Sequence, residues 1–517
     1  MKRQSGHVSI FLAISSVVIF SLFCTLLESG RAYALHYLNS QGSESAIQSV
    51  FAAFEGDVMR EYGILLRRGK ENGRTVWTEE AKEYLTRYWQ PGIGSLYEEG
   101  DRLMAEDIRI QDLASVYITG GNGRIFISEV EDYMKSAGLS VLIKEFMERV
   151  GLYNEEDGFY LLSSLKEMLG NKEGGIENVL KDYKDIRKKA KELQKMAQEQ
   201  ENKAASGNGQ GAADEGGKPS ASSRKNIKSD LLEQIKAVRR NGLIAVITGT
   251  QELSKYSWED PDLPSRLPAL QKNANASFAP SRISLLDHFL LGEFMMHKMG
   301  HYRAPRENGA AYEAEYVLNG KNTDKASFEM VMGELLLIRI GLNMAHMITD
   351  AEKLSRAEMT AVSILSVFAL PQLTLILKWL LVAGWTLAES IVDLRRLAEG
   401  KKVPLWKTKA SWQLKTIKLD LSAEADAGGG LLYEDYLRLL FYLGDAREQA
   451  YRMMDVMQKR IGLKKQDFMM DEYMVYAAAS IQVTAPYLYI QIPAFIPGQS
   501  GRGRKYSKQA AYGYGRR

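Results

Sequence analysis

The amino-acid sequence predicts a predominantly helical α+β protein, in which an N-terminal transmembrane helix precedes a helix-rich ectodomain with small antiparallel sheets. Three observations lead to this expectation. An uninterrupted apolar run lies near the N-terminus, apolar residues recur at helical spacing through much of the later chain, and short alternating segments lie beside turn residues. The 517 residues suffice for about two to four structural units.

Composition and charge are those of an ordinary globular chain. Hydrophobic residues make up 45% and charged residues 25%. Lys and Arg total 67 against 64 Asp and Glu, and the net charge of +3 gives no strong field for nucleic acid, so no nucleic-acid partner is expected. The single cysteine, Cys24, lies inside the apolar run. The rest of the chain can therefore form no disulfide and no thiolate metal site.

The first element is the apolar run from Val8 to Leu27, which we interpret as a membrane anchor. Helical residues rise about 1.5 Å each, so this run reaches across the roughly 30 Å hydrocarbon layer of a bilayer. The apolar core of a secretory signal peptide is shorter, roughly 7 to 15 residues, which favours a retained anchor. Ala32 and Ala34 form an A-x-A pattern, so cleavage after Ala34 stays open as the alternative.

Charges beside the anchor predict its orientation. Residues 1–7 form a short leader with Lys2 and Arg3, and this positive charge favours a cytoplasmic N-terminus. We therefore expect a single-pass protein of the cell membrane that contacts lipid through residues 8–27 and has its bulk outside the cytoplasm. Small and apolar residues after the anchor keep helical spacing, which predicts that the helix continues out of the membrane.

An N-terminal ectodomain region is expected over residues 28–203. The segments VYIT and RIFI flank a glycine-rich turn at 120–123, and this pattern predicts a hairpin. Apolar residues at heptad-like spacing over 176–197 fit a coiled coil or helical hairpin and equally a solvated amphipathic helix. Residues 204–226 contain scarcely any large apolar side chain, which predicts a disordered linker.

A helix-rich α+β domain is expected over residues 227–500, followed by a basic tail, 501–517. Alternating residues from Ile481, with LYIQIP after Pro486, predict one or two strands, for which Trp412 to Leu419 is a possible partner. The tail carries six basic residues and no acid. It is interpreted as a disordered terminus, and contact with anionic wall polymer or lipid is the alternative. Helical periodicity predicts helices over Leu285 to Met299, Ser327 to Thr349, Ala351 to Leu370 and Leu431 to Ile461.

The apolar block over residues 359–388 has two interpretations. Lys378 lies near its middle, and a charge at that place in a membrane helix costs roughly 2.5 to 3.5 kcal/mol. Two buried helices that meet at Pro371 satisfy the same pattern without that cost. We favour the buried pair, and a second membrane span that makes the protein polytopic is the alternative.

The best candidate for chemistry is Glu293, His297 and His301, spaced four residues apart so that a continuous helix places them on one face. Such a set can bind zinc in a metal-dependent extracytoplasmic hydrolase. However, Gly300 is expected to end the helix, and the sequence lacks H-E-x-x-H, a Walker loop and a G-x-S-x-G elbow. We therefore expect no bound metal, no cofactor and no enzymatic activity, and the hydrolase remains the alternative.

Several segments together resemble a known family. The sequence is similar to an uncharacterised family of Gram-positive membrane-anchored proteins associated with TadE/TadG-like, tight-adherence type IV pilus systems. The resemblance implies a pseudopilin-like or accessory surface component, and no activity is established for the family. It is carried by GHVSIFLAISSVVIFSLFCTLLESGRA, SVFAAFEGDVMREYGILL, YEAEYVLNGKNTDK, WTLAESIVDLRRLAEGKKVPLWKTKASW and YEDYLRLLFYL.

The N-terminus both follows and departs from the pilin pattern. Gly6 after a short basic leader resembles the site at which a prepilin peptidase cuts. The fifth position beyond it is Phe11, where type IV pilins usually carry Glu. This departure favours an accessory role over that of a major pilin. The expected function is therefore a non-enzymatic assembly component whose partners are pilin-like or pilus-assembly proteins, with self-association left open.

Overall fold

The structure of the protein, a computed structural model, describes residues 5–89, 107–138, 244, 247–248, 252–267, 283–366, 371–414, 429–487 and 503–514. Helices predominate, and the strands form small antiparallel sheets, which confirms the predicted fold class. The chain divides into two compact units. The sheet unit comprises Met1–Tyr133, Pro261–Ile283 and Met457–Arg517, and the helical unit comprises Met134–Asp260 and Ser284–Val456.

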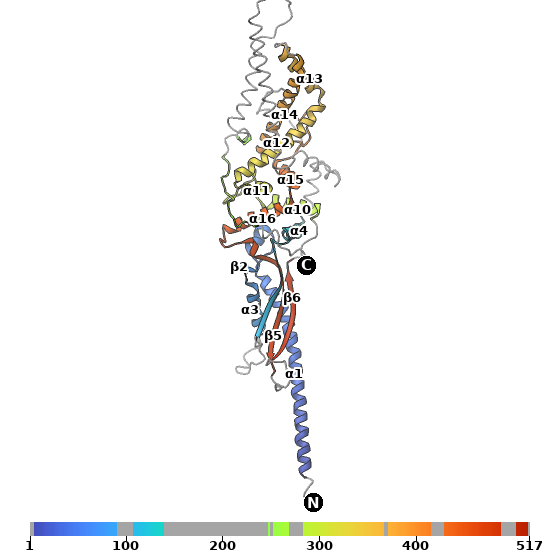
Figure 1. The fold of residues 1–517 in the computed structure, drawn as a ribbon, viewed down its shortest axis with the longest axis vertical. Helices are drawn as coiled ribbons and strands as arrows, with labels where there is room; N and C mark the ends of the chain where they lie inside the picture. The colour runs from blue at the N-terminus through green and yellow to red at the C-terminus, as the bar shows by residue number, and fades with distance from the viewer. Residues whose placement is uncertain are drawn as a thin grey trace, which may run out of the picture. The chain divides into compact units, whose positions relative to one another are not determined.

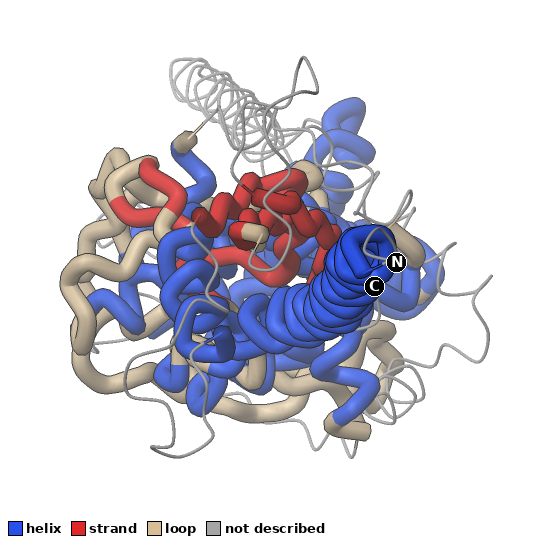
Figure 2. Tube along the Cα trace, turned by 90° about the horizontal axis from the view of Figure 1, so that it is seen from below, coloured by secondary structure: helices blue, strands red, loops and turns tan. Residues whose placement is uncertain are grey.

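The sheet unit is built on one long helix, α1 (Ser5–Ala52), drawn in blue in Figure 1. No proline interrupts its 48 residues, and the helix continues well past the apolar run, as the sequence predicts. Figure 2 looks along α1 from its N-terminal end and shows the strands beside it. The other helical elements that lie wholly in this unit are α2 (Gly56–Tyr62), α3 (Trp77–Trp89) and the short η1 (Pro264–Arg266) and η3 (Met470–Glu472).

The sheet is organised around β5 (Tyr473–Pro486), which pairs antiparallel with all three of its neighbours. Its buried and half-buried residues alternate, so one face is apolar and fully covered. This confirms that the alternating segment near Ile481 is a strand. Its neighbours are β1 (Arg67–Arg68), β4 (Asp107–Tyr117) and β6 (Gly503–Gly513), and a separate hairpin joins β2 (Lys70–Glu71) to β3 (Arg74–Thr75).

The hairpin predicted around the glycine turn at 120–123 is wrong. β4 includes Val116 and Tyr117, but RIFI begins the helix α4 (Arg124–Ser136) rather than a second strand. Ile125, Phe126 and Val130 of α4 are all buried. Their spacing matches one face of a helix, and β4 finds its hydrogen-bonding partner in β5 instead.

The C-terminal tail and the partner predicted for the terminal strand are also corrected. Residues 503–513 of the tail form β6, which pairs with β5 along its length. Residues 412–414 form no strand, because the Glu389 carboxylate accepts the backbone N–H groups of Gln413 (2.7 Å) and Leu414 (2.9 Å). Residues expected as one domain over 227–500 are instead divided between the two units. The heptad-like segment 176–197 and the linker 204–226 lie outside the described residues.

The helical unit contains the predicted helices with one break. The helix expected from Leu431 to Ile461 is two helices, because Gly444 has an extended backbone and the Asp445 carboxylate accepts the N–H of Arg447 (2.8 Å) at the start of the second. The last residues of that second helix belong to the sheet unit. The helices are α10 (Leu285–Lys298), α11 (Glu313–Asn319), α12 (Asp324–Thr349), α13 (Ala351–Ser366), the short η2 (Pro371–Leu373), α14 (Thr374–Ala398), α15 (Tyr433–Leu443) and α16 (Ala446–Gly462).

A buried network of charges joins α12, α14 and the segment after α14. Arg339 has no exposed surface and donates to Asp393 (2.8 Å) and to the carbonyl oxygen of Leu405 (2.9 Å). Lys407, also buried, donates to Glu389 (2.7 Å). Loss of one partner would leave an unpaired buried charge, which costs about 3 to 5 kcal/mol.

Another buried carboxyl group, Glu315 of α11, has no basic partner among its hydrogen bonds. Its Oε1 accepts the N–H of Tyr302 (2.9 Å) and the hydroxyl of Tyr433 (2.8 Å). Complete burial raises the pKa of Glu315 to about 7. The folded chain therefore holds this proton at pH values at which the unfolded chain has released it.

We predict that the Glu315→Gln variant loses part of the pH dependence of stability. Between an unfolded pKa of 4.5 and a folded pKa of about 7, the folded state binds more protons. The free energy of unfolding therefore falls as pH rises through this window, by at most about 1.4 kcal/mol per pH unit. Thermal unfolding at pH 5 and pH 7.5 measures this fall, which should be smaller in the variant. The exposed-face control Glu329→Gln should behave like the parent, and an equal fall in all three proteins would contradict the assignment.

Candidate functional site

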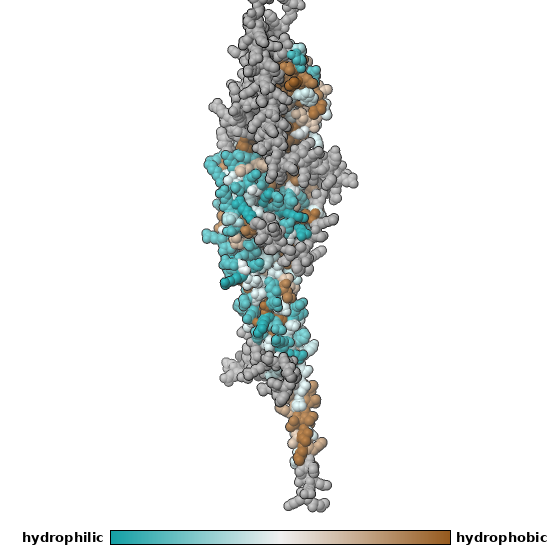
Figure 3. Space-filling model, in the orientation of Figure 1, coloured by the Kyte–Doolittle hydropathy of each residue, from teal (hydrophilic) through white to brown (hydrophobic). Residues whose placement is uncertain are grey.

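The apolar half of α1 is exposed along its whole length. The most apolar 18-residue window of the candidate span that begins at Val8 has a mean hydropathy of 2.6, and none of this window is buried. Phe11, for example, leaves 70% of its surface uncovered. Large bare apolar surfaces are unusual in water and mark sites of contact with lipid or protein. Figure 3 shows the hydrophobic residues gathered on this part of the helix.

Polar side chains within the apolar half bond back to their own helix. The Ser16 hydroxyl donates to the carbonyl oxygen of Leu12 (2.6 Å), and the Thr25 hydroxyl donates to that of Ser21 (2.7 Å). Such bonds satisfy hydroxyl groups where no water is available. Both the length of this half and the internal hydrogen bonds of its hydroxyl groups suit a helix that lies across a bilayer.

The apolar surface ends at a buried ion pair. Glu28 and Arg31 lie one helical turn apart, with 2.9 Å between Oε1 and Nη1. The candidate cleavage residues Ala32 and Ala34 follow directly and lie inside the continuous helix, as does Gly6 in its first turn. Beyond this point α1 is covered on one side by the sheet unit.

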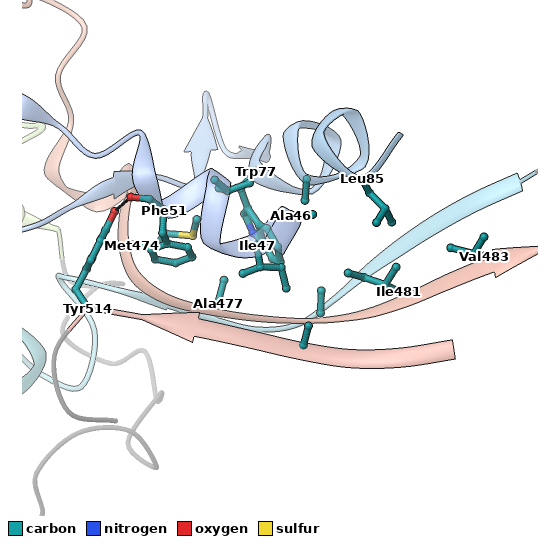
Figure 4. Close-up of a cluster of buried hydrophobic side chains, with 14 residues drawn as sticks. Ala46, Ile47, Phe51, Trp77, Leu85, Met474, Ala477, Ile481, Val483 and Tyr514 are labelled. Carbon is teal, nitrogen blue, oxygen red and sulfur yellow. Dashed lines mark hydrogen bonds between the residues drawn. The ribbon is translucent and has the colours of Figure 1, made fainter. Parts of the chain in front are cut away.

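The second half of α1 packs on the sheet. Ala46, Ile47 and Phe51 of α1 lie against Trp77 of α3 and the apolar face of β5, as Figure 4 shows. The hydroxyl of Tyr514, just after β6, donates to the carbonyl oxygen of Phe51. α3 and the β5–β6 pair, which lie far apart in the sequence, therefore hold the second half of α1, whereas the apolar first half is bare.

The predicted metal candidate does not assemble. α10 ends at Lys298, so His301 lies beyond the helix that carries Glu293 and His297. The Glu293 carboxylate is bound by the Arg438 guanidinium at 2.7 and 3.2 Å. Burial lowers the pKa of His301. Among the described residues, no group of three or more His, Cys, Asp and Glu side chains is placed to hold a metal ion.

The alternative second span falls on the α13–α14 hairpin. Besides α1, the helices α12 and α14 are also long and apolar enough to cross a membrane, but about half of each apolar window is buried within the protein. The Lys378 ammonium lies 2.6 Å from the Glu358 carboxylate, which pairs the charge that the sequence places inside the block. Trp385 of α14 packs on Trp412 in a buried cluster. Only part of this block is core: the residues from Leu381 onward are mostly buried, whereas Met359, Leu375 and Trp379 nearer the tip of the hairpin are exposed apolar side chains.

A polar cavity of about 270 Å³ in the sheet unit is lined by Arg67, Arg68 and Lys465. Each cation has an acidic partner: Arg67 pairs with Glu80, Arg68 with Glu472 and Lys465 with Glu55. The Arg68 and Lys465 pairs tie β1 and Glu55, which precedes α2, to the segment before β5, and the Arg67 pair ties β1 to α3. The basic side chains that line the cavity therefore have a structural role, as partners in these ion pairs.

Comparison with known proteins gives a family without an assigned activity. The family described as "Family of unknown function (DUF5702)" matches residues 221–485, which is just over half of the chain. No curated protein and no solved structure matches the chain. The matched range includes the described helices of the helical unit and β5, and it excludes α1, β4 and β6.

We predict that the same substitution has a large effect on stability in the second half of α1 and almost none in the apolar half. Ile47→Ala removes a fully buried side chain from the core and should lower the free energy of unfolding by about 2 to 5 kcal/mol. Ile19→Ala, at a residue that is 66% exposed, should change it by less than about 0.5 kcal/mol. Denaturant unfolding of the detergent-solubilised protein measures both. Equal losses would mean that α1 is not divided in this way.

Proposed function

The chain belongs to the DUF5702 family of unknown function, and we propose that it is a non-enzymatic, membrane-anchored assembly component of a Tad-like pilus or secretion system. The observation that carries the proposal is the division of α1 into a bare apolar half and a half held by the sheet. An anchored subunit needs the first half for lipid or neighbouring helices. It needs the second half to connect that anchor rigidly to its ectodomain.

The pilin-like part of the proposal rests on two supports. The sequence blocks quoted above resemble a family associated with tight-adherence pili in Gram-positive bacteria. In addition, one helix that is bare along its apolar half can exchange lipid contacts for contacts with other apolar helices, since lipid tails and apolar side chains are similar solvents. Phe11 offers no charge to a neighbouring subunit, so the role is accessory or pseudopilin-like.

The proposed topology is single-pass, with a cytoplasmic N-terminus. Above the Lys378–Glu358 pair, the described part of α13 extends from Met359 to Ser366, about 12 Å at 1.5 Å per residue. A span needs about 30 Å. The C-terminal part of α14, from Leu381 onward, is mostly buried in the core of the protein. These lengths favour a hairpin that stays on one side of the membrane.

Photo-crosslinking in native membranes tests the assembly role. A photoreactive residue in place of Phe20, which is 67% exposed, should crosslink to the apolar N-terminal helix of pilin-like proteins. The control is Leu463, an exposed apolar residue of the sheet unit outside the apolar run, and it should give none of these products. Crosslinks from Phe20 to lipid alone would overturn the assembly role and leave the anchor intact.

Thiol labelling of intact cells tests the topology. In a Cys24→Ser background, Glu352→Cys in the first turn of α13 and Lys402→Cys after α14 should both react with an impermeant reagent added outside. Lys2→Cys should react only after permeabilisation, because the leader is cytoplasmic. Labelling of only one of the two hairpin positions would instead establish a second span.

A further inference from the structure

The end of β6 nearest the apolar run carries two exposed basic residues that form no ion pair within the described part of the sheet unit. Arg504 and Lys505 are both exposed, and neither has an ion pair with any residue that the structure describes. The Arg504 guanidinium lies 5.7 Å from the centre of the Tyr506 ring. Tyr506 itself is buried and packs on Leu35 of α1. These contacts hold β6 against α1 at a fixed height, that is, at a fixed position along the axis of α1.

Contacts along the strand fix that height. Tyr514 meets α1 at Phe51, and Tyr506 meets it at Leu35. Strand residues rise about 3.3 Å each and helical residues about 1.5 Å each, so these two contacts agree with β6 lying along α1. Two strand residues further, Arg504 comes level with about position 31 of α1. That is about 6 Å beyond Leu27, where the apolar run ends.

This height coincides with lipid headgroups. The hydrocarbon core of a bilayer is about 30 Å thick and the whole bilayer about 40 to 45 Å, so each headgroup layer is roughly 5 to 8 Å deep. Tyr33 of α1 lies in the same zone with 79% of its surface exposed. Tyrosine is typical of the membrane–water interface. Among the described residues near this level, the acid Glu28 is paired with Arg31, and Asp107 at the matching end of β4 is paired with Arg109.

We propose that Tyr33, Arg504 and Lys505 form a membrane collar that binds the anionic headgroups of lipids in the leaflet from which the ectodomain emerges. This inference rests on the proposed anchoring by α1 and adds a lipid class to it. The two cations attract phosphate oxygens, and the tyrosine ring lies among the headgroups. The C-terminal strand, expected from its composition to be a disordered tail, thus sets how deeply the sheet unit sits on the membrane.

Lysine acylation of the full-length protein in lipid nanodiscs tests the collar. In discs that contain phosphatidylglycerol and phosphatidylcholine, Lys505 should react at least three-fold more slowly than in discs of phosphatidylcholine alone. Added 0.5 M NaCl should restore its rate, since salt screens exposed charges. Lys82 of α3 is the matched control. Lys82 is exposed and follows Ala81, which belongs to the same core as Trp77. Because Lys82 lies more than a Debye length from the bilayer, its acylation rate should not change.

A double variant separates lipid binding from mere proximity. Arg504→Gln with Lys505→Gln should reduce the phosphatidylglycerol that remains bound after detergent extraction, by about five-fold per charge removed. Lys82→Gln should retain the parental amount. Two outcomes would overturn the collar but not the anchor. One is that the double variant retains as much phosphatidylglycerol as the parent. The other is that protein which has entered the discs shows the same Lys505 acylation rate in both lipid compositions. Failure to enter the discs overturns the proposed anchor as well.

Discussion

The helix α1 has one half that suits lipid and another half that must be covered in water, and the arrangement of the sheet unit follows from that constraint. The apolar half of α1 has no protein cover, whereas Ile47, Val50 and Phe51 need one as soon as the helix enters water. α3, β5 and β6 supply that cover, and the two strands lie hundreds of residues after α1 in the sequence. The core around α1 can therefore close only after the whole chain exists. Contacts so distant in sequence are costly to form, because a long loop must be closed before they contribute.

The same constraint explains why the family match and the folded units have different limits. Residues 221–485 include β5 but none of the three strands that pair with it. A strand with both edges unpaired exposes two rows of hydrogen-bonding groups. The matched segment is therefore incomplete as a folded unit, and β4, β6 and α1 complete it. The anchor is in this sense part of the fold rather than an attachment to it.

The sequence predicted what is local and missed what is distant. The anchor and the helices of the helical unit follow from periodicity, which each segment carries by itself. The partner of β5 does not, because the pairing depends on which segment arrives beside it. RIFI reads equally as strand and as the buried face of α4. Glu293, His297 and His301 have metal-ligand spacing, but the helix ends at Lys298, and Arg438 binds Glu293. In the tail, only every fourth residue, Tyr506, Ala510 and Tyr514, is buried, so its composition resembles that of a disordered terminus.

The chemistry of the apolar half limits how such a subunit can assemble. Inside lipid, helices gain nothing from the hydrophobic effect when they meet, so association depends on close packing and on hydrogen bonds between helices. Ser16 and Thr25 already bond to their own helix, and Phe11 provides no charge. Packing of apolar side chains is what remains, and it is weak for any single pair of helices. In the proposed assembly, a stable position then requires several neighbouring helices at once, or further contacts made by the sheet unit that packs on the second half of α1.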